Sequence, residues 1–340
     1  MELAQIAGCL FGMALGDALG AETEFLDMYA IRRQFPPNGP QEPPGNPARV
    51  TDDTQMALAV GDALLAATRP YTPESVATEL VRTFIDWYNH PDNDRAPGNT
   101  CLTACENLIN GQPWPQASDI GSKGCGANMR VMPVGLLNVD ETTRAQIAQL
   151  QAAITHSHPT ALAASDLTAF VIADLADGGS LDNLPQRVRW YVNAQRDIYH
   201  AYWLGDVWQR AYMMPTARHY ISNGWEECLE VLNRLDRALI VIDRESDPCL
   251  ATGAGWIAEE AFATGLLCFL MYPDDPAAVI HRAAATSGDS DSIAAIAGAF
   301  AGAHCGLDSW PQDWVDRIEY HDHLQSMSEG LARLHEETTT

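Results

Sequence analysis

Length, composition and charge place the chain among globular proteins and argue against two classes of partner. The chain has 340 residues, of which 46% are hydrophobic, and a formal net charge of −25 at pH 7. So acidic a chain argues against a nucleic-acid partner, because such proteins meet phosphates with a basic stripe, and it disfavours docking on anionic membranes. The length permits one large domain, since length is only a soft guide to domain number.

Cysteine usage and the N-terminal residues bear on where the protein works. Eight cysteines are spread along the chain without a CxxC pair, which is typical of reduced thiols in a cytoplasmic protein. Residues 3–21 form an apolar run that Gln5 and Asp17 interrupt, with no basic segment and no cleavage pattern around it. We therefore expect a core helix here, not a signal peptide, and a cytoplasmic location.

The N-terminal helix carries glycine at every fourth position. Because residues four apart share a helix face, these glycines form one stripe: Gly8, Gly12, Gly16 and Gly20. A matching stripe near the other end of the chain consists of Gly298, Gly302 and Gly306. Each glycine weakens a helix by about 1 kcal/mol relative to alanine, so their retention suggests a closely approaching backbone. The alternative is a composition that simply tolerates glycine.

Helical periodicity continues through the rest of the chain. A proline- and glycine-rich loop occupies residues 34–49, and further helices are predicted at residues 55–67, 73–88, 100–109, 142–157, 160–175, 257–271, 276–285 and 292–305. Residues 181–244 are rich in aromatic and charged side chains, and we expect a peripheral helical insertion whose aromatics serve packing. Alternating strand patterns are nearly absent, so the prediction is an all-α fold in a single domain, residues 1–340.

Two short acidic clusters open alanine-rich runs at opposite ends of the chain, 236 positions apart (289 − 53). They read Thr51-Asp52-Asp53-Thr54 and Gly288-Asp289-Ser290-Asp291-Ser292. Carboxylates flanked by hydroxyls suit a hard cation with oxygen ligands, and four gathered carboxylates need positive charge to offset their repulsion. Either cluster alone could instead cap a helix N-terminus. Because the two clusters have the same build, a pair of divalent ions bound between them is favoured. Only the fold can bring the clusters together.

A glycine loop gives the next strongest local signal. It reads Ser122-Lys123-Gly124-Cys125-Gly126 and contains the one lysine of the chain, with Arg130 nearby. Alternating glycines let backbone N–H groups turn toward an anion, and a helix starting after the loop would add its positive end. This predicts a phosphate-binding loop, although the pattern matches neither a Walker loop nor a GxGxxG after a strand. A plain glycine turn between helices is the alternative.

Five further positions are candidates for roles near such a site. Asp17 lies inside an apolar helix and needs partners, which favours a structural role, whereas Glu24 could reach the metal site. His156 and His158 lie at the end of a predicted helix, where histidines either bond free carbonyls or contact substrate. Gly98 lies in a turn before a helix and could let a ligand approach.

Taken together, these motifs resemble the ADP-ribosylglycohydrolase family, in consistent order along nearly the whole chain. They read GCLFGMALGDALGAETEF, VTDDTQMALA, RAPGNTCLTA, GSKGCGANMRVMPVGL, THSHP, ATGAGWIAEEA and SGDSDSIAAIAGAFAG. TDDT paired with GDSDS is the most specific part, while residues 181–244 lie outside the resemblance. The resemblance implies a single compact orthogonal helical bundle with a binuclear metal site in a central cleft.

The resemblance also implies roles for individual residues. Two magnesium ions, or manganese in their place, would be held by Thr51, Asp52, Asp53, Asp289, Asp291 and Ser292. The catalytic residues would be Glu24, which matches the family's mobile glutamate, with Asp53 and Asp289. Substrate would contact Gly98, Asn99, Ser122, Lys123, Gly124, Cys125, Gly126, His156, His158 and Trp256. Some members carry an aspartate just before the glycine that matches Gly98, whereas Ala96 and Pro97 stand here, so the general base can differ.

The implied activity is magnesium-dependent hydrolysis of the N-glycosidic bond that joins ADP-ribose to a modified arginine side chain. An ADP-ribosylated protein would be the substrate and ADP-ribose the product, with no nucleic acid and no membrane involved. Three alternatives stand beside this activity. They are a serine-directed, O-linked hydrolase of the same family, a non-catalytic ADP-ribose- or metal-binding module, and, from the residues alone, a two-metal phosphohydrolase.

Overall fold

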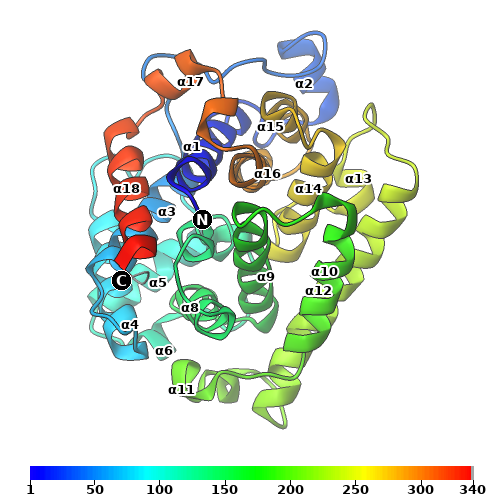
Figure 1. Cartoon of the computed structure of the whole chain (residues 1–340). Coiled ribbons are helices and arrows are strands. Elements are labelled where there is room, and N and C mark those ends of the chain that lie inside the picture. The colour runs from blue at the N-terminus through cyan, green and yellow to red at the C-terminus, as the bar shows by residue number, and fades with distance from the viewer. Residues whose placement is uncertain (338–340) are drawn as a thin grey trace.

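The computed structural model describes residues 1–337, which form α-helices and short 3-10 helices joined by loops (Figure 1). These residues contain no strand, only four isolated bridges, which confirms the predicted all-α class. The α-helices are α1 (Leu3–Gly20), α2 (Met28–Gln34), α3 (Asp52–Ala66), α4 (Pro73–Tyr88), α5 (Asn99–Ile109), α6 (Trp114–Ala117), α7 (Met132–Gly135), α8 (Glu141–Ala153), α9 (Pro159–Ala176), α10 (Leu184–Gln195), α11 (Ala201–Leu204), α12 (Ala217–Ile240), α13 (Cys249–Thr252), α14 (Ala258–Met271), α15 (Pro276–Ala284), α16 (Ser290–Cys305), α17 (Gln312–Arg317) and α18 (His321–Glu337). The 3-10 helices are η1 (Cys125–Ala127), η2 (Leu181–Asn183), η3 (Val207–Arg210) and η4 (Leu307–Ser309).

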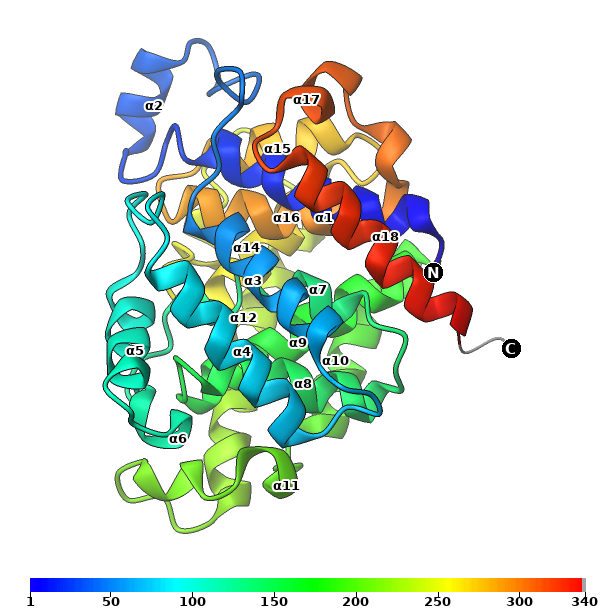
Figure 2. The same ribbon diagram turned by 90° about the vertical axis from the view of Figure 1, so that its left-hand side faces the viewer.

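Helices α1 and α16 lie side by side and make the most extensive helix–helix contact among the described residues (Figure 2). Their glycines meet backbone to backbone. A Cβ atom placed on Gly12 would lie 2.3 Å from the carbonyl oxygen of Gly298, and one on Gly8 would lie 2.4 Å from that of Gly302. Such a space admits no side chain, so the two stripes allow the close approach that the sequence predicted.

The same pairing brings three chain segments to one end of the pair. The helices are antiparallel, because Gly8 faces Gly302 while Gly20 faces Ser290, whose hydroxyl donates to the Gly20 carbonyl at 2.9 Å. The turn after α1 is tied to the same place, since Thr23 donates from Oγ1 to Ser290 Oγ at 3.1 Å. The end of α1 therefore lies beside the start of α16, where the second acidic cluster stands.

A second buried helix, α9, is surrounded by α8, α12, α14 and α16. Both α1 and α9 are long and apolar enough to cross a membrane by length and composition. Most of each helix is nevertheless buried inside the protein. The N-terminal apolar run is thus a core helix in this structure, as predicted.

Residues 181–244 contribute both to the core and to the surface. Helix α12 packs against α9 and α14, and the side chains of Tyr191 and Trp225 are fully buried. In contrast, Trp190, Tyr202 and Tyr212 are exposed. Part of this segment therefore closes the core around α9, and its outer aromatics face solvent.

The glycine loop does not lead into the helix that the sequence suggested after it. The glycine loop is followed by a single 3-10 turn, η1, and not by a helix long enough to direct a dipole at an anion. The chain stays irregular here because Cys125 N and Ala258 N bond to the carbonyls of Trp256 and Lys123 across the loop. These bonds tie the loop to the start of α14.

Candidate active site

The two acidic clusters meet at the first turns of α3 and α16. The hydroxyl of Ser292 donates to Oδ2 of Asp53 at 2.8 Å, so residues from the two ends of the chain are in direct contact. Thr51 caps α3 by accepting a hydrogen bond from Asp53 N at 3.3 Å. Helix capping and metal binding therefore do not exclude each other here, since the hydroxyl of Thr51 caps α3 and the side chain of Asp289 makes no capping bond at α16.

Glu24 completes this group from the turn that follows α1. Its carboxylate, with those of Asp289 and Asp291, offers oxygen atoms that all lie within 4.8 Å of one another. Asp289 and Asp291 are buried, and Glu24 is half-buried. The structure thus places Glu24 beside the second acidic cluster, within reach of the predicted metal site.

The carboxyl groups of this site cannot all be ionised without a cation. Burial, followed by the charge of Asp291, raises the pKa values of Asp52, Asp53 and Asp289 well above their usual range. The same two causes, with Asp52, raise the pKa of Glu24 to about 9. Buried carboxylates gathered in this way need either protons or a bound positive ion, and their oxygens suit a hard divalent cation. The donor set therefore fits the metal that the sequence predicted.

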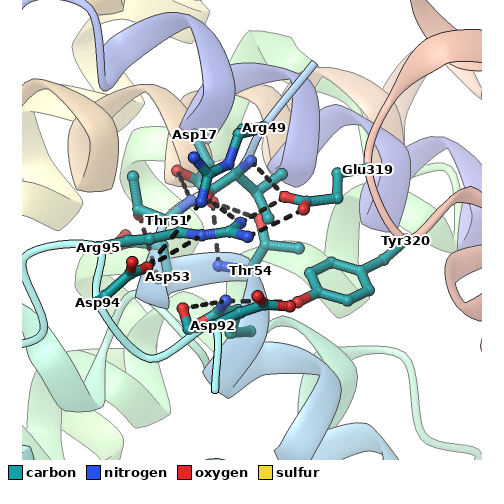
Figure 3. Close-up of polar contacts among 12 residues, drawn as sticks. Asp17, Arg49, Thr51, Asp53, Thr54, Asp92, Asp94, Arg95, Glu319 and Tyr320 are labelled. Carbon is teal, nitrogen blue, oxygen red and sulfur yellow. Dashed lines mark hydrogen bonds and ion pairs between the residues drawn. The ribbon is translucent and has the colours of Figure 1, made fainter. Parts of the chain in front are cut away.

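Asp17 holds the first acidic cluster in place (Figure 3). Its carboxylate accepts from Thr51 N at 3.0 and 3.1 Å, from Thr54 N at 3.1 Å and from Thr54 Oγ1 at 2.5 Å. Burial and the charge of Asp291 raise its pKa to about 7, while the bonds from Thr54 and Thr51 lower it. This is the structural role expected of an aspartate inside an apolar helix, since every oxygen has partners.

An ion pair that the sequence did not indicate holds the backbone segment just before α3. Arg95 and Glu319 pair directly, and both bond to the backbone of Val50: Arg95 Nη1 donates to its carbonyl at 2.8 Å, and Glu319 Oε2 accepts from its N–H at 3.1 Å (Figure 3). Glu319 lies far along the chain, and no local pattern marks it. Only the tertiary structure shows that these two residues position Thr51.

The glycine loop lies beside the acidic site. Ser122 Oγ is 2.9 Å from Thr100 Oγ1, in the first turn of α5. Gly98, the N-cap of that helix, donates from its N–H to Asp52 Oδ2 at 3.4 Å, and Asn99 follows it. The start of α5 thus joins the loop to the first acidic cluster, so a ligand could touch both.

The ammonium group of Lys123, in the glycine loop, is paired with two carboxylates. Its Nζ lies 2.7 Å from Oε2 of Glu227 and 2.7 Å from Oε1 of Glu259. Glu259 is 3% exposed, and burial raises the pKa of its carboxyl group while the bond from Lys123 lowers it, so the lysine compensates the charge of a buried carboxylate. Glu227 belongs to α12, in the segment whose contacts the sequence could not foresee.

The two histidines have different surroundings. His156 is buried against the glycine loop, since a Cβ atom on Gly126 would lie 3.0 Å from its Cε1. His158 is the N-cap of α9, and its Nδ1 accepts a hydrogen bond from Thr160 N at 3.2 Å. It therefore caps a helix N-terminus, and the alternative of bonding the carbonyls of a preceding helix is wrong for it.

An aromatic pair covers the turn that carries Glu24. Phe25, the next residue, stacks on Trp256 with ring centroids 5.5 Å apart and an interplanar angle of 19°. Phe25 adopts a φ of 66°, which is uncommon for a non-glycine residue. The sequence named Trp256 but not Phe25, because an exposed aromatic in a turn carries no recognisable signal.

Comparison with known proteins identifies the family. The profile of the ADP-ribosylglycohydrolase family matches residues 2–340. Over 92% of this chain and 89% of the relative, it is 24% identical to ADP-ribosyl-(dinitrogen reductase) glycohydrolase of Rhodospirillum rubrum. It is 26% identical to ADP-ribosylhydrolase ARH3 of Homo sapiens, over 98% of this chain and 94% of that relative. It is 24% identical to ADP-ribosylarginine hydrolase Tri1 of Serratia proteamaculans, over 97% of this chain and 79% of that relative.

A solved structure supports the same assignment at the level of the fold. The chain superposes on an ADP-ribosylglycohydrolase-related protein complex with a TM-score of 0.66 and 22% identity, over 98% of both chains. The family profile covers almost every residue, and the named relatives are hydrolases. The chain belongs to the ADP-ribosylglycohydrolase family and is an enzyme, a glycosidase that removes ADP-ribose.

Proposed function

We propose that the protein is a magnesium-dependent hydrolase that removes ADP-ribose from modified arginine side chains of proteins. The observation that carries the proposal is the contact between two remote acidic clusters, Ser292 with Asp53, beside the carboxylates of Glu24, Asp289 and Asp291. The relative named ADP-ribosylarginine hydrolase supports the arginine linkage. We place the enzyme in the cytoplasm, where its eight free cysteines would stay reduced.

The acidic residues offer oxygen ligands for two magnesium ions, with manganese as a possible replacement. Thr51, Asp52 and Asp53 would supply them from α3, and Asp289, Asp291 and Ser292 from α16. When bound, such ions would grip hydroxyls of the distal ribose and polarise the water that attacks its anomeric carbon. Because the metal-free carboxyl groups have raised pKa values, they would release protons when the metal ions bind to them.

The residues of the chain would then act on the ribose directly. Cleavage of a glycosidic bond places positive charge on the anomeric carbon, which a nearby carboxylate stabilises. We assign this role to Glu24, since it lies on a turn at the edge of the site and not inside a helix. The leaving arginine is already cationic, so it needs little help from a general acid.

The glycine loop and the residues around it, beside the acidic site, would hold the remainder of ADP-ribose. Glycines at 98, 124 and 126 let the backbone come close to the diphosphate. The neighbouring side chains that would contact it are those of Asn99, Ser122, Cys125, His156, His158 and Trp256. Lys123 would act there mainly through its backbone, since two carboxylates already bind its ammonium group.

The test compares two protein substrates with defined linkages. Purified enzyme with magnesium is incubated with arginine-modified and with serine-modified protein, and the products are identified by mass spectrometry. We expect intact ADP-ribose from the arginine-modified protein, loss of turnover in Glu24→Gln, and normal turnover in Glu22→Gln, a control in the same turn. Release from the serine-modified protein alone would overturn the linkage. AMP or phosphate as product, or binding of ADP-ribose without turnover, would overturn the proposed reaction.

A further inference from the structure

His156 lies between a threonine and the glycine loop. Its Nδ1 is 2.8 Å from Oγ1 of Thr155. Its Nε2 faces the loop, since a Cβ atom would lie 3.3 Å from it if placed on Gly126 and 3.5 Å if placed on Gly124. A neutral imidazole donates from one nitrogen and accepts at the other, so the position of its proton decides what His156 offers to the loop.

The buried Arg130 fixes the direction of the hydrogen bonds around Thr155. Its guanidinium donates from Nε to Gln151 Oε1 at 2.9 Å, and from Nη2 to Gln151 O and to Thr155 Oγ1, both at 2.8 Å. It is fully buried over the ring of Phe84, and within residues 1–337 no carboxylate pairs with it. A guanidinium has only donors. Thr155 Oγ1 therefore accepts from Arg130 and has its own hydrogen left to donate.

Two acceptors compete for the hydrogen of Thr155. One is Nδ1 of His156, and the other is the sulfur of Cys101, a thiol that burial keeps neutral by raising its pKa to about 11. A thiol sulfur is a weak acceptor and an imidazole nitrogen a strong one. The charge of Arg130 adds to this preference, because a lone pair at Nδ1 faces the cation favourably and an N–H does not. Burial and this charge also lower the pKa of His156 to about 3, so the ring is neutral.

We infer that Arg130 and Thr155 hold His156 in the Nε2–H tautomer, so that its ring donates a hydrogen bond toward a ligand on the glycine loop. The identity of that ligand rests on the proposed function, in which the acceptor is a diphosphate oxygen of ADP-ribose. The opposite tautomer would turn a lone pair toward this oxygen and repel it. Arg130 and Thr155 are thus positioning residues, which act on the ligand only through His156.

The tautomer can be measured without any ligand. Nitrogen NMR of the ring, in protein labelled at histidine and assigned by comparison with His156→Gln, reports which nitrogen carries the proton. We expect a protonated Nε2 and a bare Nδ1 in the wild type and in Thr155→Ser, which keeps the hydroxyl. Thr155→Val removes the hydroxyl at nearly constant shape, and we expect it to lose this pattern. A proton on Nδ1 in the wild type would overturn the inference.

The hydrogen bond to the ligand is measured by calorimetric titration with ADP-ribose. Thr155→Val should bind about tenfold more weakly, the equivalent of one hydrogen bond, and Thr155→Ser should bind like the wild type. His156→Gln, whose amide can place an N–H where Nε2 stands, should retain more affinity than His156→Leu. Equal affinities for all of these variants would overturn the donor role. Failure of the wild type to bind ADP-ribose would contradict the proposed function, while the NMR pattern would still decide the tautomer.

Discussion

Ser292 and Asp53, 239 positions apart, share a hydrogen bond of 2.8 Å between the first turns of α16 and α3. Helix α1 contacts both α16 and the start of α3, and so holds the two residues in place. Its glycines lie against the backbone of α16, and its Asp17 accepts hydrogen bonds from the start of α3. The packing of α1 is therefore part of the acidic site, since it fixes where both clusters begin.

Removing the charge of Asp291 should stabilise the metal-free protein and stop turnover. After burial, the charge of Asp291 is the leading cause of the raised pKa values of Asp52, Asp53, Asp289 and Glu24. We expect Asp291→Asn to raise the free energy of unfolding in chelator by about 1 kcal/mol or more, because a functional site stores such repulsion. Urea unfolding in chelator measures this effect, and turnover with magnesium measures the loss of activity.

The control for this variant is Glu230→Gln, which removes an exposed carboxylate on α12. It should leave both measurements unchanged, since an exposed charge without close partners contributes little. If Asp291→Asn instead unfolds at lower urea than the wild type in chelator, the carboxylates do not repel one another as described.

Two glycine-to-alanine changes should separate packing from ligand approach. A Cβ atom on Gly16 would lie 2.0 Å from the Ala294 carbonyl oxygen, so Gly16→Ala should lower the free energy of unfolding by about 3 kcal/mol. Gly98 has no atom within 4 Å of its Cβ position, so Gly98→Ala should change stability by less than about 0.5 kcal/mol. The methyl group should nevertheless weaken ADP-ribose binding, which calorimetry measures. Unchanged binding would remove Gly98 from the ligand surface.

Lys123 should matter for stability more than for binding. Lys123→Met leaves the buried Glu259 without its counter-charge and should cost about 2 kcal/mol of unfolding free energy. The double variant with Glu259→Gln should recover most of this loss, because the uncompensated carboxylate is then gone. ADP-ribose affinity should change little in either variant. A large loss of affinity with unchanged stability would restore Lys123 as a phosphate ligand.

Asp166 should give the fold a pH dependence that is separate from the acidic site. Burial raises its pKa to about 7, although Tyr191 and Gln149 donate to it and lower it. The folded state then binds a proton that the unfolded state releases near pH 4, so stability falls as pH rises from about 4 to 7. Asp166→Asn should lose this slope and exceed the wild type in stability at pH 8. The Oε1 atom of Gln149 has no partner in the structure. Once the side-chain amide of Gln149 turns over, this oxygen can accept a hydrogen bond from the new amide in Asp166→Asn.

Urea unfolding of both proteins at pH 5 and pH 8 tests this prediction. The comparison is between the two slopes, since the other titrating groups are common to both proteins. Parallel slopes would show that the pKa of Asp166 is not raised in the folded state.

Local patterns with a direct physical cause could be predicted from the sequence. Glycine at four-residue spacing predicted the close approach of α1 and α16, and an aspartate in an apolar helix predicted the bonds of Asp17. The paired acidic clusters indicated a shared site because both have the same build and gathered carboxylates need a positive charge. In each case the sequence pattern itself contains the energetic problem that the fold has to solve.

Contacts between remote and unpatterned residues could not be predicted. Glu319 reaches Val50 and Arg95, and Glu227 reaches Lys123, but neither glutamate differs from a solvated one in sequence. Phe25 is exposed and has meaning only through Trp256. The helix expected at residues 142–157 ends at Ala153, because the backbone beyond it bonds to Asp119 instead: Asp119 N donates to Thr155 O, and Ser157 N donates to Asp119 O.

Magnesium uptake by the metal-free protein, followed by titration calorimetry in the wild type, Asp53→Asn and Asp291→Asn, tests the central claim most directly. We predict saturable binding in the wild type and its loss in both variants, because residues from the two ends of the chain form one ligand set. No magnesium uptake by the wild type, or undiminished uptake in either variant, would contradict the account.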